Sequence, residues 1–224
     1  MANPRNLARL QESTARVGHI AAERQRNTAA VALGARRLKE SRKFWARWRV
    51  RLGYPVALVY WALAAPTWRS MLIGGIVAAL GLATRAASSG YLRKDERLTT
   101  TGPYARTRNP LYLGSALLAA GFMIAGLSWV AGVLVGIYFA VFYYAVMRSE
   151  ERDLRERFGP AFDEYAARVP LFLPRFGRAA PELEAESFSW AQYRRNREYQ
   201  ALIGTIAGLG SLCLRMWIRA RFGH

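Results

Sequence analysis

The amino-acid sequence predicts an all-α, polytopic membrane protein with a core of four transmembrane helices in two hairpins. Two observations support this prediction. Hydrophobic residues make up 52% of the chain, yet the formal net charge is +18. The apolar residues are gathered into long blocks, and arginines crowd the segments between them. This distribution is typical of membrane proteins, because a soluble fold would have to bury that much apolar surface.

Four apolar runs have the length that a helix needs to cross about 30 Å of hydrocarbon, roughly 17–20 residues. They cover residues 52–68, 71–87, 111–127 and 129–147. Helices are expected because unpaired backbone is not tolerated in lipid. Tight corners at residues 66–69 and 126–128 predict that the runs pair as antiparallel hairpins.

The chain divides into three predicted parts. Residues 1–50 form a basic helical arm, residues 51–174 the transmembrane core, and residues 175–224 a linker followed by a C-terminal helix. The last apolar run, residues 201–214, has only about 14 residues and is followed by several arginines, Arg215, Arg219 and Arg221. We therefore expect an interfacial helix there, with a fifth membrane span as the alternative.

The distribution of arginines predicts the orientation. The two corners carry one cation, Arg69, whereas the arm, the loop 85–108 and the region after Arg148 are basic. The N-terminus, the loop, any site beside it and the C-terminal region after Arg148 are thus expected to face the cytosol, and both corners the opposite side. An anionic lipid surface accounts for both the charge and the apolar blocks, so we expect membrane lipids and no nucleic acid as partners.

Other residue types limit the functions further. One cysteine, Cys213, and two histidines, His19 and His224, offer little for a metal centre, and we expect no metal. Glycine pairs with GxxxG spacing, at 132/136 and 204/208, let helices approach closely, which makes a homodimer a candidate assembly.

A polar loop precedes the third run. The stretch TGPYARTRNPLYLG, residues 101–114, opens with a turn signal, and Asn109-Pro110 fits an N-cap followed by the first helical residue. Simple helix capping, with the arginines as interface anchors, is one interpretation. The other is a binding site, because a helix N-terminus favours anionic groups and four specific side chains gather within nine residues. They belong to Tyr104, Arg108, Asn109 and Tyr112.

Paired carboxylates, Glu150-Glu151, end the fourth run. One interpretation is a solvated turn in which they pair with the neighbouring arginines 148, 152 and 155. The other follows from the predicted hairpin, which brings them beside the 101–114 loop. There a carboxylate could accept two hydrogen bonds from a ribose diol, or neutralise an amino group.

These motifs together resemble the isoprenylcysteine carboxyl methyltransferase and phospholipid methyltransferase superfamily of membrane enzymes. The resemblance rests on GPYARTRNPLYLG, the glutamate pair and FGPAFDEYAARVPLFLP, within about residues 91–174. It implies S-adenosylmethionine as methyl donor and a lipid-like or small amphipathic acceptor. It also implies roles for particular residues. The donor would contact Leu98, Thr99, Tyr104, Asn109, Pro110, Leu111, Tyr112 and Glu150. Glu151 would support Glu150, and Arg108 or Arg148 would orient an anionic acceptor.

Two positions depart from the superfamily pattern. Asn109 stands where a histidine is usual, so no acid or base role is expected for it. Val146 stands where members that methylate prenylcysteine carboxylates have an arginine, which disfavours that acceptor. Because the donor's sulfonium already activates the methyl group, the protein is expected to align the reactants and exclude water.

Two alternative functions remain open at this point. A membrane reductase of the sterol reductase type would bind NADPH, but the chain has no basic cluster clearly dedicated to a 2′-phosphate. A non-catalytic membrane scaffold would use its basic arms to bind anionic lipid. Saturable binding of S-adenosylhomocysteine, of NADPH, or of neither would separate the three functions.

Overall fold

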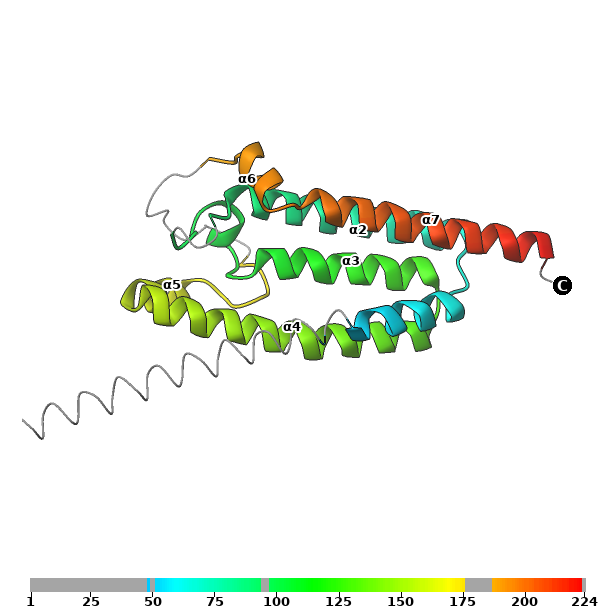
Figure 1. The fold of residues 1–224 in the computed structure, drawn as a ribbon, viewed down its shortest axis with the longest axis horizontal. Coiled ribbons are helices and arrows are strands. Elements are labelled where there is room, and N and C mark those ends of the chain that lie inside the picture. The colour runs from blue at the N-terminus through cyan, green and yellow to red at the C-terminus, as the bar shows by residue number, and fades with distance from the viewer. Residues whose placement is uncertain (1–47, 49–50, 94–96, 176–186, 223–224) are drawn as a thin grey trace, which may run out of the picture. The chain divides into compact units, whose positions relative to one another are not determined.

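A computed structural model describes residues 48, 51–93, 97–175 and 187–222. The described residues form helices and loops, without a β-strand among them. Residues 51–63 are helical, and the later elements follow in chain order (Figure 1). These are α2 (Trp68–Tyr91), the 3₁₀ helix η1 (Gly102–Ala105), α3 (Pro110–Gly126), α4 (Trp129–Phe158), α5 (Pro160–Arg168), α6 (Trp190–Arg195) and α7 (Tyr199–Phe222). Apart from Trp48, the predicted basic arm lies outside the described residues.

Three helices in the described part of the chain, α2, α4 and α7, are long and apolar enough to cross a membrane, and α3 is a shorter apolar helix. The all-α, polytopic fold is therefore confirmed. The fourth apolar run continues as a charged helix beyond the predicted span, to Phe158. Gly159, with a φ of 53°, ends α4, and Pro160 starts α5 as the first helical residue.

The first corner lies at residues 64–67, two residues earlier than predicted. Thr67 and Ser70 form a reciprocal capping box at the start of α2. The Thr67 hydroxyl accepts from the Ser70 amide at 3.2 Å, and the Ser70 hydroxyl accepts from the Thr67 amide at 2.9 Å. This cap starts the helix at Trp68. Trp68 and Arg69 consequently belong to α2 and not to the corner.

Helices α2 and α3 pack with their backbones in direct contact. A Cβ added at Gly74 would lie 2.6 Å from the Ala125 amide nitrogen, and one at Gly81 would lie 2.7 Å from the Gly114 carbonyl oxygen. From the other side, a Cβ at Gly121 would lie 2.7 Å from the Gly74 carbonyl oxygen. Close approach through small residues is the usual way in which helices associate in lipid. The two helices therefore have a single tight register.

The C-terminal apolar run is longer than the sequence suggested. Helix α7 is continuous over 24 residues and is one of the three helices that could cross a membrane. The expectation that this run is too short to cross is therefore wrong, and the alternative of a further span fits the helix. Its middle packs on α3, since a Cβ at Gly208 would lie 2.7 Å from the ring of Phe122.

The predicted apolar run ended at residue 214 because Arg215 is charged, yet α7 continues beyond this residue to Phe222. The Nε of Arg215 donates to the Ala64 carbonyl at 2.7 Å, and Nη2 donates to the Ala62 carbonyl. The guanidinium also lies 4.8 Å from the ring centroid of Trp61. The charge is thus absorbed by backbone carbonyls and an aromatic face, and the helix continues past it.

The direction of α7 changes the predicted charge distribution. Because Arg215 contacts the first corner, the end of α7 lies at the corner end of the helices, opposite the loop before α3. The expectation that the whole region after Arg148 shares the side of that loop is wrong for this helix. Its last cations join Arg69 at the corner end. The orientation in the membrane remains a prediction.

The glycine pairs considered for a homodimer have different surroundings. Gly208 accommodates Phe122 of the same chain, as described above. Added Cβ atoms at Gly204 and Gly136 would meet nothing within 4 Å among the described residues, whereas one at Gly132 would meet Met123 at 3.3 Å. Two positions thus leave room for a partner helix, and the homodimer remains a proposal.

Neighbouring glycines in α2 provide a matched test of the α2–α3 contact. Gly74→Ala should lower the thermal unfolding midpoint in detergent, because overpacking against backbone costs about 1–3 kcal/mol. Gly75→Ala should leave the midpoint equal or slightly higher, because a Cβ there meets nothing within 4 Å and alanine favours a helix by about 1 kcal/mol. Circular dichroism at 222 nm measures both. Equal midpoints for the two variants would contradict the contact.

Candidate functional site

The polar loop before α3 is joined to the segment after α5 by hydrogen bonds at each of residues 106–109. Two join backbone groups: the Arg108 amide donates to the Pro170 carbonyl and the Arg175 amide to the Arg106 carbonyl, each at 2.9 Å. Two come from side chains: the Thr107 hydroxyl donates to the Phe172 carbonyl at 2.9 Å, and the Asn109 amide Nδ2 to the Leu171 carbonyl at 3.0 Å. Each loop thus provides hydrogen-bond partners for backbone N–H and C=O groups of the other, and these bonds hold the two loops together.

Asn109 occupies the N-cap position of α3, but its side chain does not cap the helix. It is 8% exposed and donates instead to Leu171, 62 residues further along the chain. The predicted capping role of this side chain is therefore wrong, because the neighbouring loop offers its carbonyl. Pro110 is the first helical residue, as predicted, and is buried.

Glu151 lies in a buried charge cluster. Its side chain is 7% exposed, with Oε1 2.7 Å from Nη1 of Arg108 and Oε2 accepting from Nη1 of Arg148 at 2.8 Å. The expected proximity of the loop and the carboxylate pair is confirmed. A solvated turn is the wrong description for Glu151, and Arg155 instead pairs with Asp163 at 2.7 Å. Glu151 contacts the two arginines, and its expected support of Glu150 remains a prediction.

Glu150 faces the first turn of α3. The Tyr112 hydroxyl donates to its Oε1 at 2.8 Å. The Tyr112 ring in turn meets Tyr143 of α4 edge to face, with centroids 5.6 Å apart. The half-buried carboxylate of Glu150 is therefore oriented by a side chain that is itself held by aromatic packing.

Tyr104 lies in η1 and is 7% exposed. Its carbonyl accepts from the Tyr165 hydroxyl of α5 at 2.8 Å. Burial raises the pKa of Tyr104 far above its ordinary value, and the nearby Tyr165, Glu150 and Glu198 raise it further. The phenol consequently stays protonated at neutral pH and can only act as a hydrogen-bonding group.

The other predicted donor contacts have structural partners. Leu98 packs against the buried cluster of Phe162, Tyr165 and Val169. The Thr99 hydroxyl is buried and accepts from the Arg93 amide at 3.3 Å. The roles of Leu98 and Thr99 in donor binding remain predictions.

Buried polar atoms without a partner indicate where a ligand would fit. Among the described residues, three such side-chain atoms accept or donate no hydrogen bond: Thr101 Oγ1, Arg108 Nε and Glu151 Oε1. The Glu151 atom has only the ion-pair contact with Arg108. Because buried polar groups are normally satisfied, a polar ligand beside Arg108 and Glu151 would complete the hydrogen bonding of these two side chains. The cluster therefore fits a polar cofactor such as the one that the sequence implied.

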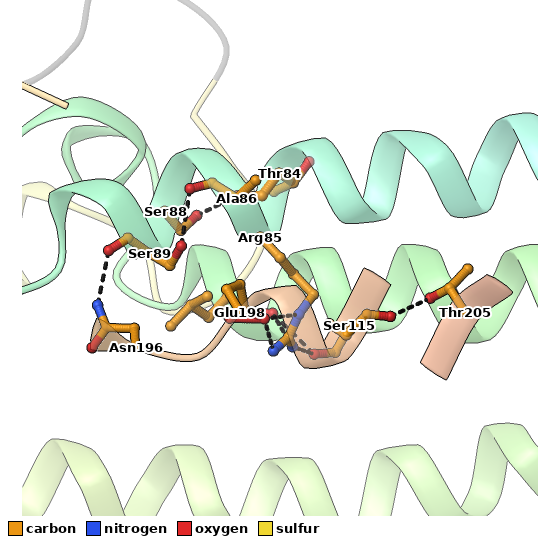
Figure 2. Close-up of polar contacts among 11 residues, drawn as sticks. Thr84, Arg85, Ala86, Ser88, Ser89, Ser115, Asn196, Glu198 and Thr205 are labelled. Carbon is orange, nitrogen blue, oxygen red and sulfur yellow. Dashed lines mark hydrogen bonds and ion pairs between the residues drawn. The ribbon is translucent and has the colours of Figure 1, made fainter. Parts of the chain in front are cut away.

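A second charged cluster was missed by the sequence analysis. It joins Arg85 of α2 to Glu198, which precedes α7, and to Ser115 of α3 (Figure 2). The available signal was Arg85 itself, the only charged residue in the apolar run 71–87. A charge within such a run indicates a functional or paired site by default. Its partner could not be identified, because Glu198 lies 113 residues away.

Comparison with known proteins finds a family match that overlaps the part of the chain with the motifs. The family model described as Phospholipid methyltransferase matches residues 57–161. The cobalt-zinc-cadmium resistance protein CzcN of Cupriavidus metallidurans is 36% identical over 137 residues, which is 57% of this chain and 62% of that protein. The nickel-cobalt-cadmium resistance protein NccN of Alcaligenes xylosoxydans xylosoxydans is 41% identical over 83 residues, 37% of this chain and 38% of that protein.

A protein-S-isoprenylcysteine O-methyltransferase of Schizosaccharomyces pombe is 31% identical over 81 residues, 36% of this chain and 34% of that enzyme. The chain thus spans less than two thirds of each of these relatives. No solved structure matches the chain. The family match includes the loop before α3, both helices of the second hairpin and the carboxylate pair. The segment that holds this site is therefore similar to the phospholipid methyltransferase family and, through the relative from Schizosaccharomyces pombe, to a membrane methyltransferase.

Proposed function

We propose that this protein is an S-adenosylmethionine-dependent membrane methyltransferase that acts on a lipid-like or small amphipathic acceptor. The observation that carries the proposal is the junction of α3 and α4, where Tyr112 orients Glu150 and Arg108 meets buried Glu151. This junction lies inside the segment that matches the phospholipid methyltransferase family. It also holds two of the three buried polar atoms that lack a partner among the described residues.

The residues of the junction offer what the donor requires. S-adenosylmethionine supplies a methyl group that its sulfonium already activates. Glu150 can accept hydrogen bonds from ribose hydroxyls or from an ammonium group, and Tyr112 holds it in place. Arg108 Nε is buried and offers a hydrogen bond to a further polar part. The protein's own contribution is alignment of the reactants and exclusion of water.

The charge cluster bears on the acceptor. Arg108 and Arg148 both contact Glu151, so an anionic acceptor would have to compete with this carboxylate for either arginine. Val146, at the position of the arginine in prenylcysteine-specific members, is 8% exposed and cannot bind a carboxylate. We therefore favour an acceptor without a carboxylate at the reacting end.

The comparisons favour methyl transfer over a membrane reductase or a non-catalytic scaffold, because the matched family and the yeast relative are both named for it. The two bacterial relatives are named for metal resistance. In the described part of the chain, no group of three or more His, Cys, Asp or Glu side chains could hold a metal ion. Metal binding is therefore not part of the proposal.

Glu150→Gln should weaken the binding of S-adenosylhomocysteine to the detergent-purified protein by about 10- to 100-fold. Hydrogen bonds to charged groups contribute about 1.5–3 kcal/mol, and each 1.4 kcal/mol is about tenfold in affinity. Isothermal titration calorimetry measures the affinity. Glu156→Gln is the matched control, because Glu156 is exposed on the same helix. Wild-type affinity in the Glu150 variant would refute the site.

Tyr112→Phe should weaken the same binding by about 3- to 10-fold, because it removes the hydroxyl that orients Glu150 and keeps the ring. Tyr144→Phe is the control, since Tyr144 is 57% exposed on α4. Equal affinities for the two variants would show that the Tyr112 hydroxyl does not contribute.

The reaction itself is tested with an isotope-labelled methyl donor. Purified protein incubated with the labelled donor and host-membrane lipids should transfer the label to an amphipathic product that mass spectrometry detects. The Glu150→Gln variant should transfer none. Saturable binding of NADPH, without methyl transfer or binding of S-adenosylhomocysteine, would favour the reductase instead.

A further inference from the structure

A pocket lies between α2 and the segment that leads into α7. Its cavity is about 180 Å³, roughly six times the volume of a water molecule in the liquid, about 30 Å³. The lining is mostly apolar, with Leu82, Ala86 and Leu202 on its walls. Two charged side chains, Arg85 and Glu198, also line it. The pocket thus combines apolar walls with one ion pair.

Four of the five N–H groups of the Arg85 guanidinium have a partner. Its Nε donates to Glu198 Oε1 at 2.7 Å, and Nη2 donates to the same oxygen. Its Nη1 donates to the Ser115 hydroxyl and, at 3.4 Å, to the Leu111 carbonyl. Figure 2 shows the guanidinium between Glu198 and Ser115. A guanidinium has five N–H groups, so these four contacts leave one N–H on Nη2.

Glu198 likewise has an unused oxygen. Both contacts from Arg85 reach Oε1, and no residue in the described ranges donates to Oε2. A fork-to-fork pair of arginine and carboxylate would have used both oxygens. The pocket therefore offers one hydrogen-bond donor from Arg85 beside one acceptor from Glu198. The pair is neutral as a whole.

The backbone around Glu198 is held in place. Asn196 Nδ2 donates to the Ser89 carbonyl at 2.8 Å, near the C-terminal end of α2 (Figure 2). It also donates to the Leu92 carbonyl at 3.1 Å. Arg197 then adopts a φ of 54°, which turns the chain into α7. The Glu198 side chain is 8% exposed. Its position is thus set by hydrogen bonds to the partner helix and does not depend on the ion pair alone.

We propose that this pocket binds a single-chain amphiphile with a hydroxyl head group. The hydroxyl donates to Glu198 Oε2 and accepts from Arg85 Nη2, while the first carbons of the chain lie against Leu82, Ala86 and Leu202. The cavity holds the head group and these first carbons, and the rest of the chain extends into lipid. This inference goes beyond the proposed function and does not depend on it.

Head-group chemistry separates the hydroxyl from the other common amphiphiles. A hydroxyl both donates and accepts, which matches the two unused groups. A carboxylate cannot donate and would face the charge of Glu198. An ammonium cannot accept and would face the charge of Arg85. Either ion would also add an uncompensated charge to a neutral, largely buried pair.

Photolabelling of the full-length protein in detergent tests the site. Three dodecyl probes carry a diazirine near the head group and end in a hydroxyl, an amine or a carboxylate. The hydroxyl probe should label peptides containing residues 82–86 and 201–202, and excess unlabelled dodecanol should compete. The other two probes should label these peptides several-fold less. Labelling of the exposed residues Val133, Leu134 and Ile137 of α4 by all three probes provides the reference for unspecific apolar contact.

Three variants decide the outcome. Leu202→Trp fills the edge of the pocket and should abolish the competed labelling, whereas Ile206→Trp, exposed on the same helix and outside the pocket, should leave it unchanged. Glu198→Gln should reduce the competed labelling about tenfold. If the Glu198 variant does not fold, Leu202→Trp alone tests the site. Labelling that is equal for the three head groups, or that survives Leu202→Trp, overturns the inference. Unchanged binding of S-adenosylhomocysteine in Leu202→Trp separates this result from the proposed function.

Discussion

The contact between the backbones of α2 and α3 fixes the register of these two helices and the position of Arg85 beside α3. In lipid, helices gain little from hiding apolar surface, so close packing and polar contacts decide how they associate. Glycines along the seam leave no room for the helices to slide. One of them also positions a charge: a Cβ at Gly114 would lie 2.5 Å from Cγ of Arg85. The missing side chain lets Arg85 cross α3 and reach Ser115.

The first turns of α3 serve two clusters on different faces. On the side of α4, Tyr112 holds Glu150. On the side of α2, the Leu111 carbonyl and the Ser115 hydroxyl hold Arg85. Each buried carboxylate, Glu151 in one cluster and Glu198 in the other, is matched by arginine. Such pairing is what allows charges to persist beside a membrane-length bundle.

Features that depend on neighbouring residues could be predicted from the sequence, whereas features that depend on distant partners could not. Helix α3 starts at Pro110 as predicted, because the proline fixes a helical φ there. The meeting of the loop with the carboxylate pair was predictable, because a short corner forces two helices side by side. The length of α7 was not, because the carbonyls that absorb the charge of Arg215 lie about 150 residues earlier. The role of the Asn109 side chain was predicted wrongly and the Arg85 cluster was missed for the same reason, since the partners of both come from distant segments.

The pairing of Arg85 with Glu198 has a consequence for biosynthesis. The ribosome makes the carboxylate 113 residues after the cation, so α2 enters the bilayer with its guanidinium uncompensated. A lone arginine at the centre of a span costs about 2.5–3.5 kcal/mol on insertion scales, and less near an end. Arrival of the last helix removes this penalty. A nascent chain that stops short of α7 therefore keeps Arg85 without its carboxylate partner, and the Ser115 hydroxyl and Leu111 carbonyl of α3 are then its remaining contacts.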